Sequence, residues 1–345
     1  MSEAEGIPRG PALRPKLSAG MLHAVCEQYG IAGNFVRDLG GSSNLNLLLE
    51  DAGQRYVARV HRPWMTASRL ADMQAVRRAL ARGGVPCAQP LETRGGDTWI
   101  EVEDRLVEVE PYVEHDANMD SWQRLEVALP LLGQAHELMR PLEVSEAGRH
   151  PPAANHVEAS KALVWTSRGT SRIRTWQPSP SEQRLADASE ELARLLAHAE
   201  RESVQLPRQL VHGDFWDNNV LFHKDRVVLV ADLDFMGERL RIDDLALVLY
   251  YANSTFWDDP LSDDRMRKLR DLVDAYDRGL TDHLTSAERA ALPLALARTP
   301  LCFVGMVASV DTEVGAKRLA AEISWDVAWA LALVRDLDRW QAAFA

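Results

Sequence analysis

The chain has 345 residues, 46% of them hydrophobic, which is enough to bury one large core or two fused ones. Its 51 acidic residues outnumber its 39 Lys and Arg, and the formal net charge of −12 argues against binding to nucleic acid and leaves room for a pocket that attracts cations. The three cysteines, Cys26, Cys87 and Cys302, lie far apart without CxxC spacing. They predict neither a disulfide framework nor a structural zinc site and are typical of a reducing, cytoplasmic location.

Residues 1–17 are expected to be a loose tail. They contain early acids and prolines but no apolar stretch, unlike a signal peptide or a membrane anchor. No apolar run in the chain reaches the roughly 20 residues that a membrane-spanning helix needs. The sequence therefore predicts a soluble protein without a membrane partner.

Residues 18–113 are predicted to form a small, mostly β lobe. The run 44–61 reads as a hairpin with an Ala-Gly turn, and further β segments follow between residues 99 and 113. Within this lobe, residues 66–82 place apolar side chains at spacings of three and four before Gly83 and Gly84, which predicts one helix.

Residues 114–345 are predicted to form a larger, helical lobe. Apolar faces at helical spacing recur in five segments, at 121–139, 181–199, 262–282, 286–298 and 316–342. Residues 141–180 combine prolines, serines and arginines with little periodicity, which predicts a long surface segment. The expected fold class is therefore α+β, with a β-rich part before a helical part.

The stretch LVHGDFWDNNVLF, residues 210–222, carries the main functional signal. Asp214 and Asn219 stand five apart, directly before a run of strand-forming residues. The residues HKDR that follow can turn this strand, and VVLVADLD can return it, which folds Asp232 back toward the loop. Three side chains with oxygen atoms are expected to converge.

This pattern resembles the family of aminoglycoside phosphotransferases, choline kinases and type II homoserine kinases, which has a bilobal, protein-kinase-like fold. HGDFWDNN is similar to the family's HGDxxxxN, and VADLDF to its hydrophobic-Asp-Phe-Asp segment. Asp244-Leu245-Ala246 resembles the Asp-Leu-Ala that opens the family's next helix. Weaker similarity extends from about residue 35 to the end, so the resemblance covers most of the chain.

Phosphoryl transfer explains these residue types, because its transition state is stabilised mainly by positioning and by charge neutralisation, including that by Mg²⁺. Mg²⁺ prefers carboxylate and amide oxygens, so Asn219 and Asp232 suit it as ligands. The resemblance implies that Asp214 accepts the proton of the attacking hydroxyl, or orients it, and that His212 and Asp244 hold the loop. The alternative is that these residues only cap a loop, a strand or a helix.

ATP phosphates would have to be bound without a Walker A loop or a GxGxxG fingerprint, because the chain has neither. The turn in LGGSSNLNLLL offers free amides and hydroxyls, and it resembles the family's phosphate loop, with Ser42, Ser43 and Asn44 as the contacts. An ordinary hairpin turn is the alternative.

Arg59, in YVARVHRP, stands where kinases place a basic residue that contacts the α and β phosphates. Its usual partner is a glutamate of the following helix, but the matching slot falls at or near Met73 and the nearest carboxylate is Asp72. Whether Arg59 has a carboxylate partner is therefore left open. The alternative is that Arg59 is an ordinary arginine of an edge strand. Glu110 and Tyr112 lie in a segment that resembles the hinge whose backbone binds adenine.

The sequence gives less information about the acceptor of the phosphoryl group. Trp216 either lines the acceptor site or packs, and the acidic cluster that includes Asp258 and Asp259 either binds ammonium groups or caps a helix. The favoured function is an ATP- and Mg²⁺-dependent O-phosphotransferase acting on an aminoglycoside or related amine-bearing antibiotic. The alternatives are a metabolic kinase for homoserine, choline or a similar amino alcohol, and a kinase-like scaffold that binds nucleotide without turnover. ATP against GTP preference and the oligomeric state stay open.

Overall fold

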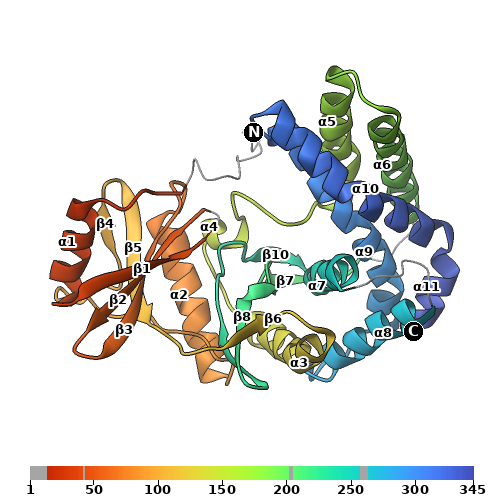
Figure 1. Ribbon diagram of the computed structural model, residues 1–345. Helices are drawn as coiled ribbons and strands as arrows, with labels where there is room; N and C mark the ends of the chain where they lie inside the picture. Colours follow the sequence, from red (N-terminus) through yellow and green to blue (C-terminus); the bar gives the residue numbers. More distant parts are fainter. Residues whose placement is uncertain (1–13, 42, 202–204, 257–262) are drawn as a thin grey trace.

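The structure is a computed structural model that describes residues 14–41, 43–201, 205–256 and 263–345 (Figure 1). A β-rich N-terminal part and a larger helical C-terminal part lie side by side. The expected α+β fold class is thereby confirmed. The proposed tail, residues 1–17, falls mostly outside the described residues.

The N-terminal part is built on an antiparallel sheet in the order β1-β2-β3-β5-β4. The predicted hairpin is present as β2 and β3, joined at Ala52 and Gly53, which both have positive φ as its tight turn requires. The elements of this part are α1 (Ala19–Tyr29), β1 (Asn34–Gly40), β2 (Leu45–Asp51), β3 (Gln54–Val60), α2 (Ala67–Arg82), β4 (Ile100–Val102) and β5 (Arg105–Pro111). Helix α1 adds to the single helix expected in this lobe.

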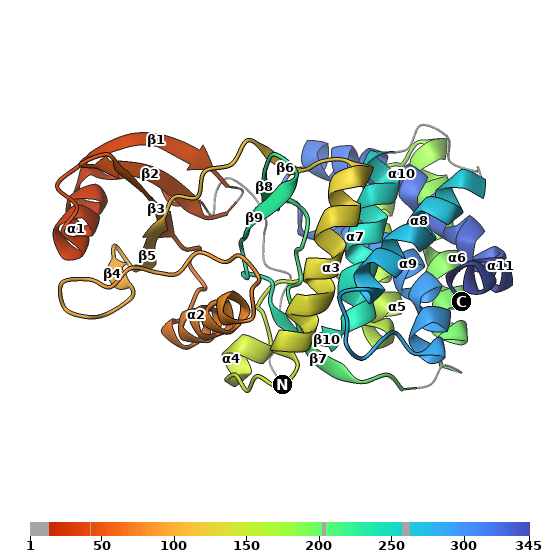
Figure 2. The ribbon, with the colours of Figure 1, turned by 90° about the horizontal axis from the view of Figure 1, so that it is seen from below.

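The two faces of this sheet differ in chemistry. One face buries Leu47, Ala58 and Val109 against α1 in a small apolar core. The other face turns Arg59 and its cross-strand neighbour Glu108 toward α2. The apolar side of α2 joins the larger C-terminal core, and Figure 2 shows this helix between the sheet and α3. A charged layer therefore lies between two apolar cores.

The C-terminal part contains the helices expected from periodicity, except that the segment 316–342 forms two helices, which meet at Asp336. Its elements are β6 (Ala117–Met119), α3 (Trp122–Met139), α4 (Glu146–Arg149), α5 (Ala162–Thr175), α6 (Pro180–Ala199), β7 (Arg208–Val211), β8 (Asp217–His223), β9 (Arg226–Val230), β10 (Gly237–Leu240), α7 (Arg241–Thr255), α8 (Asp263–Asp277), α9 (Ser286–Met306), α10 (Glu313–Arg335) and α11 (Leu337–Phe344), with short 3₁₀ turns at Ala159–Lys161 and Val307–Ser309.

The expectation of an irregular surface segment at 141–180 was wrong for α5. This helix packs closely on α9, and a Cβ at Gly169 would lie 1.9 Å from the carbonyl oxygen of Val304. Apart from Ile173, its buried side consists of small or polar residues such as Thr166 and Thr170. Close packing through small residues leaves little hydrophobic periodicity in the sequence.

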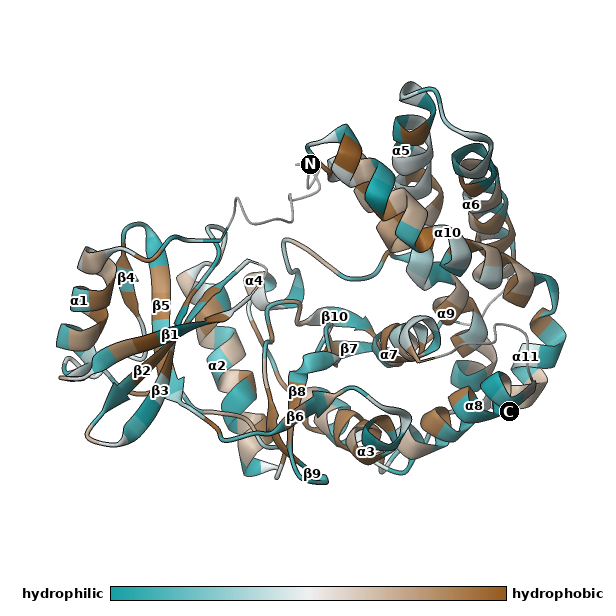
Figure 3. Cartoon of the chain, viewed as in Figure 1, coloured by the Kyte–Doolittle hydropathy of each residue, from teal (hydrophilic) through white to brown (hydrophobic). Residues whose placement is uncertain are grey.

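Among the described residues, one helical stretch, Ser286–Ser309, is long and apolar enough to cross a membrane. However, 78% of its most apolar window is buried inside the structure. Figure 3 shows α9 among other partly hydrophobic helices of the C-terminal part. Burial in the core of the protein accounts for the composition of this helix.

Candidate active site

The loop between β7 and β8 carries Asp214 and is shaped by its backbone. Gly213 has φ +81°, and a Cβ there would lie 2.2 Å from the carbonyl oxygen of Phe235, so only glycine fits. The backbone amides of His212 and Gly213 donate to the two carboxylate oxygens of Asp244, at 2.9 and 3.0 Å. The expected role of Asp244 in holding this loop is confirmed.

Two buried histidines extend the support of the loop. His212 Nε2 lies 3.0 Å from the carbonyl oxygen of Ala231, which ties the loop to the segment that carries Asp232. Burial lowers the pKa of His212, so the ring is neutral near pH 7. His136 of α3, which the sequence reasoning missed, lies 3.0 Å from Asp244. Burial alone would raise the pKa of Asp244, but its hydrogen bonds with His136 and with the backbone amide of Gly213 leave it lowered.

Asp214, Asn219 and Asp232 are brought together as the hairpin predicted. Asn219 donates its Nδ2 to Asp214 Oδ2 at 2.9 Å and to the Asp214 carbonyl oxygen at 2.9 Å. The amide of Ala231 donates to the carbonyl oxygen of Asn219 at 2.8 Å, which places Asp232 beside Asn219. Asp232 adopts φ 63°, a conformation that is uncommon outside glycine and is often found at functional sites.

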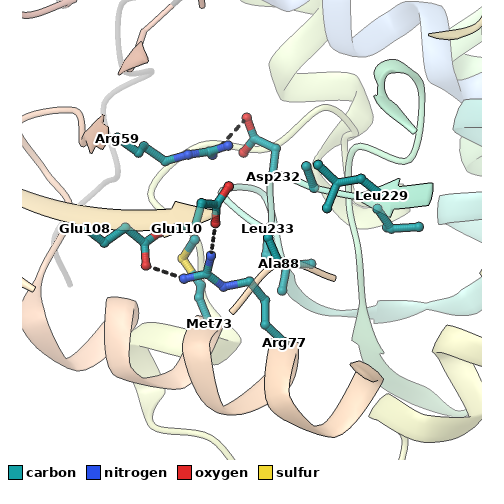
Figure 4. Close-up of a pocket in the computed structure, with 11 residues that line it drawn as sticks. Arg59, Met73, Arg77, Ala88, Glu108, Glu110, Leu229, Asp232 and Leu233 are labelled. Atoms are coloured by element: carbon teal, nitrogen blue, oxygen red, sulfur yellow. Dashed lines mark hydrogen bonds and ion pairs between the residues drawn. The ribbon is translucent and has the colours of Figure 1, made fainter. Parts of the chain in front are cut away.

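Arg59 of β3 reaches the same place from the N-terminal part. Its Nη1 lies 3.5 Å from Asp232 Oδ2, and Figure 4 shows both side chains at a pocket between the two parts. Burial opposes the charge of Arg59, but Asp232 and other carboxylates outweigh it and raise its pKa. Arg59 is therefore a fixed positive charge beside the candidate metal ligand.

The carboxylates near Arg59 do not come from helix α2, where its acidic partner was expected. Helix α2 places the apolar Met73 in the pocket and contributes a cation, Arg77. Arg77 forms ion pairs with Glu108 and, at 2.8 Å, with Glu110, both on β5 (Figure 4). In protein kinases a lysine on a strand pairs with a glutamate on a helix. Here the carboxylates are on strand β5, and the positive charge, Arg77, is on helix α2.

The turn expected to bind phosphate is tied to the C-terminal part. Asn44 donates its Nδ2 to Asp234 Oδ2 at 2.7 Å and accepts from the amide of Arg62 at 3.0 Å. Arg62 also pairs with Asp234 at 2.8 Å. Ser43 is buried, and Ser42 lies outside the described residues. This turn therefore lies near the segment of Asp232, and its phosphate contacts stay a prediction.

The profile of the phosphotransferase enzyme family matches residues 35–288. The chain belongs to this family. The family, which includes aminoglycoside phosphotransferases, is the one indicated by HGDFWDNN and VADLDF, so the resemblance is confirmed. The chain is accordingly an enzyme, a small-molecule kinase that transfers a phosphoryl group to a hydroxyl.

Individual relatives give a consistent picture. A homoserine kinase of Afipia carboxidovorans is 26% identical over 259 residues, which cover 74% of this chain and 72% of that protein. A microcompartment-associated aminopropanol kinase matches with a TM-score of 0.68 at 19% identity, over 95% of this chain and 99% of that one. An amicoumacin kinase in complex with AMP-PNP, Ca²⁺ and Ami matches with a TM-score of 0.63 at 15% identity, over 89% and 92%. These likenesses confirm the kinase-like fold.

Enzymatic phosphoryl transfer from ATP generally uses a divalent cation, and the side-chain oxygens of Asn219 and Asp232 fit one. Because Asn219 turns its Nδ2 to Asp214, its amide oxygen faces away from that carboxylate. The Asp232 side chain is 24% exposed. Among the described residues no group of three or more His, Cys, Asp or Glu is placed to hold a metal. Mg²⁺ needs only one or two protein ligands when phosphates and waters complete its shell, so the pair suits it.

Part of the segment that resembles the kinase hinge forms contacts within the phosphotransferase itself. The amide of Tyr112 donates to the carbonyl oxygen of Arg55 at 2.9 Å, and the Arg55 guanidinium lies 4.7 Å from the Tyr112 ring centroid. The Glu110 side chain faces Arg77. An adenine contact in this segment stays a prediction, and it falls to backbone groups other than the Tyr112 amide.

Trp216 belongs to an aromatic cluster close to Asp214. Its ring centroid lies 5.0 Å from that of Tyr251 and 5.8 Å from that of Phe256. Trp216 is only half-buried, so part of its surface is open. Asp258 and Asp259 lie outside the described residues, and their part in acceptor binding stays a prediction.

His156 gives the phosphotransferase a pH-dependent stability that can be measured. Burial lowers the pKa of His156 to about 3, so below pH 6.5 the unfolded chain binds a proton that the folded protein binds only near pH 3. As the pH is lowered from 6.5 to 5, this contribution to the free energy of unfolding therefore decreases by about 2 kcal/mol. Urea unfolding at both pH values should show this loss in the wild type and not in His156→Gln. Equal losses in the two proteins would contradict the assignment.

Proposed function

We propose that the chain is an ATP- and Mg²⁺-dependent O-phosphotransferase whose acceptor is a hydroxyl of a small, amine-bearing molecule. The observation that carries the proposal is the convergence of Asp214, Asn219 and Asp232 on one loop and hairpin, with Arg59 at 3.5 Å from Asp232. A candidate base and two candidate metal ligands are thus neighbours, and Arg59 and Asp232 line one pocket. Such a set is what phosphoryl transfer requires.

In the proposed mechanism Asp214 orients the acceptor hydroxyl and accepts its proton as the oxygen attacks the γ-phosphorus. Bound Mg²⁺·ATP supplies the phosphoryl group and the charge neutralisation, and ADP leaves as the bond to its β-phosphate oxygen breaks. Asn219 and Asp232 would hold the cation. Arg59 offers its guanidinium to the α and β phosphates, and this contact replaces part of its attraction to Asp232.

The size of the acceptor can be proposed from the relatives. The curated proteins matched at 24–26% identity are named homoserine kinases, and one structural neighbour is an aminopropanol kinase. We therefore place an amino alcohol or a hydroxylated amino acid ahead of an aminoglycoside, which the sequence alone favoured. The half-buried Trp216, two residues after Asp214, supports an ammonium group in the acceptor, because aromatic faces attract cations.

The test is ADP release by the purified protein with Mg²⁺·ATP across homoserine, aminopropanol, choline and a panel of aminoglycosides, with mass spectrometry of the products. We expect a phosphorylated amino alcohol or amino acid. The control is Asp232→Ala, which should bind and use Mg²⁺·ATP poorly. Phosphorylation of an aminoglycoside alone would favour the antibiotic kinase. Nucleotide binding with no product and no ADP release would favour the non-catalytic scaffold and overturn the proposal.

A further inference from the structure

Asp214 is held by a second asparagine from a distant part of the chain. Asn155 donates its Nδ2 to Asp214 Oδ1 at 2.6 Å, and the same Nδ2 lies 3.4 Å from the carbonyl oxygen of Gly213. Asn219 donates to the other carboxylate oxygen, Oδ2, at 2.9 Å. Each oxygen of the candidate base therefore accepts a hydrogen bond from a different side-chain amide.

We infer that Asn155 is a positioning residue for the catalytic base, an inference that rests on the proposed function. A carboxylate can rotate about its Cβ–Cγ bond, and one donor leaves that rotation partly free. Donors on both oxygens fix the plane of the group and so fix the direction in which it meets the acceptor hydroxyl. A misplacement of about 1 Å at such a group can cost on the order of 100-fold in rate.

The segment around Asn155 is itself fixed. Asn155 is 2% exposed. The carbonyl oxygen of Val157 accepts from Arg298 Nε of α9 at 3.0 Å, and Glu158 pairs with Arg208 of β7 at 2.9 Å. Arg298 is in turn held at 2.5 Å by Asp243 of α7. The donor to Asp214 therefore sits on a segment anchored to α9 and β7, and α7 holds the arginine that makes the α9 contact.

Asn155 and Asn219 differ in their proposed roles. Asn219 is the proposed metal ligand, so its amide serves both the cation and the base. Among the described residues, the hydrogen bonds of Asn155 Nδ2 go to the loop of Asp214. Replacement of Asn155 should therefore lower kcat while leaving the KM for nucleotide near the wild-type value.

The test is a double-mutant cycle on the rate of ADP release with the accepted acceptor. We expect Asn155→Ala to lower kcat about 10- to 100-fold with little change in the nucleotide KM. In an Asp214→Asn background the same replacement should add little further loss, because the group that it orients is already altered. Equal losses in both backgrounds, or a matching rise in nucleotide KM, would overturn the inference.

A crystal structure of Asn155→Ala gives a readout that needs no acceptor. We expect the Asp214 carboxylate to leave its wild-type orientation while Asn219 and Asp232 stay in place. An unmoved carboxylate would overturn the inference, whatever the activity. Asn253→Ala is the matched control, because Asn253 of α7 is also a buried asparagine. The kcat of this variant should stay near the wild-type value. If Asp214→Asn keeps wild-type turnover, the proposed base fails, and the crystal structure still decides the role of Asn155.

Discussion

Asp214→Asn should lower kcat by about 10²- to 10⁴-fold, the usual contribution of general acid–base catalysis. The amide is nearly isosteric with the carboxylate but cannot take the proton of the acceptor hydroxyl. It also meets the Nδ2 groups of Asn155 and Asn219 with one oxygen where the carboxylate has two. Steady-state ADP release with the identified acceptor measures the loss.

The control for this replacement is Asp217→Asn, three residues further along the chain, at the start of β8. Asp217 has φ 27°, a left-handed conformation that asparagine also tolerates, so the fold should not suffer. Turnover of this variant should stay near the wild-type value, because the proposed mechanism gives the Asp217 carboxylate no contact with the acceptor, the cation or the nucleotide. Thermal unfolding of both variants shows whether the fold is intact. Near-normal turnover in Asp214→Asn would remove Asp214 as the base.

The core of the site could be predicted because it is local. Asp214, Asn219 and Asp232 lie on one loop and one hairpin, so strand alternation and turn residues fix their relative places. The register of that hairpin, with Val220 opposite Val230, brings Asp232 back to the loop as expected. No information from the rest of the chain was needed.

The supports of the site could not be predicted, because they come from far along the chain. Asn155 is 59 residues from Asp214 and follows two prolines in a stretch without periodicity. His136 lies on the apolar side of α3, where a histidine reads as a core residue. Neither residue has a local pattern that points to the loop, and only the packing of α3 and of the 155–158 segment against β7 reveals them.

The charged layer beside Arg59 was missed for a similar reason. An acid was expected on α2, whereas the acids are Glu108 and Glu110, two positions apart on β5 and thus on one face of the sheet. Their partner, Arg77, is on α2 itself. Pairing of β3 with β5 and the position of α2 are both needed to see that these charges meet.

Arg77→Met should lower the free energy of unfolding by about 3–5 kcal/mol, because it leaves two buried carboxylates without their cation. Glu108 and Glu110 are 1% and 6% exposed. Burial raises the pKa of Glu110, whereas Arg77 and His61 leave that of Glu108 well below its usual range. Methionine keeps the helix propensity and much of the apolar stem, so lost charge is the main change. Urea unfolding at pH 7 measures the effect.

Arg78→Met on the same helix is the matched control, because Arg78 is exposed and its replacement should change stability by less than about 0.5 kcal/mol. Adding Glu110→Gln to Arg77→Met should recover part of the loss, since one uncompensated charge is removed. The same addition to the wild type should be destabilising, because it breaks the pair with Arg77. If Arg77→Met and Arg78→Met unfold at the same urea concentration, the Arg77 pairs do not stabilise the fold, and the carboxylates of β5 are neutralised in another way.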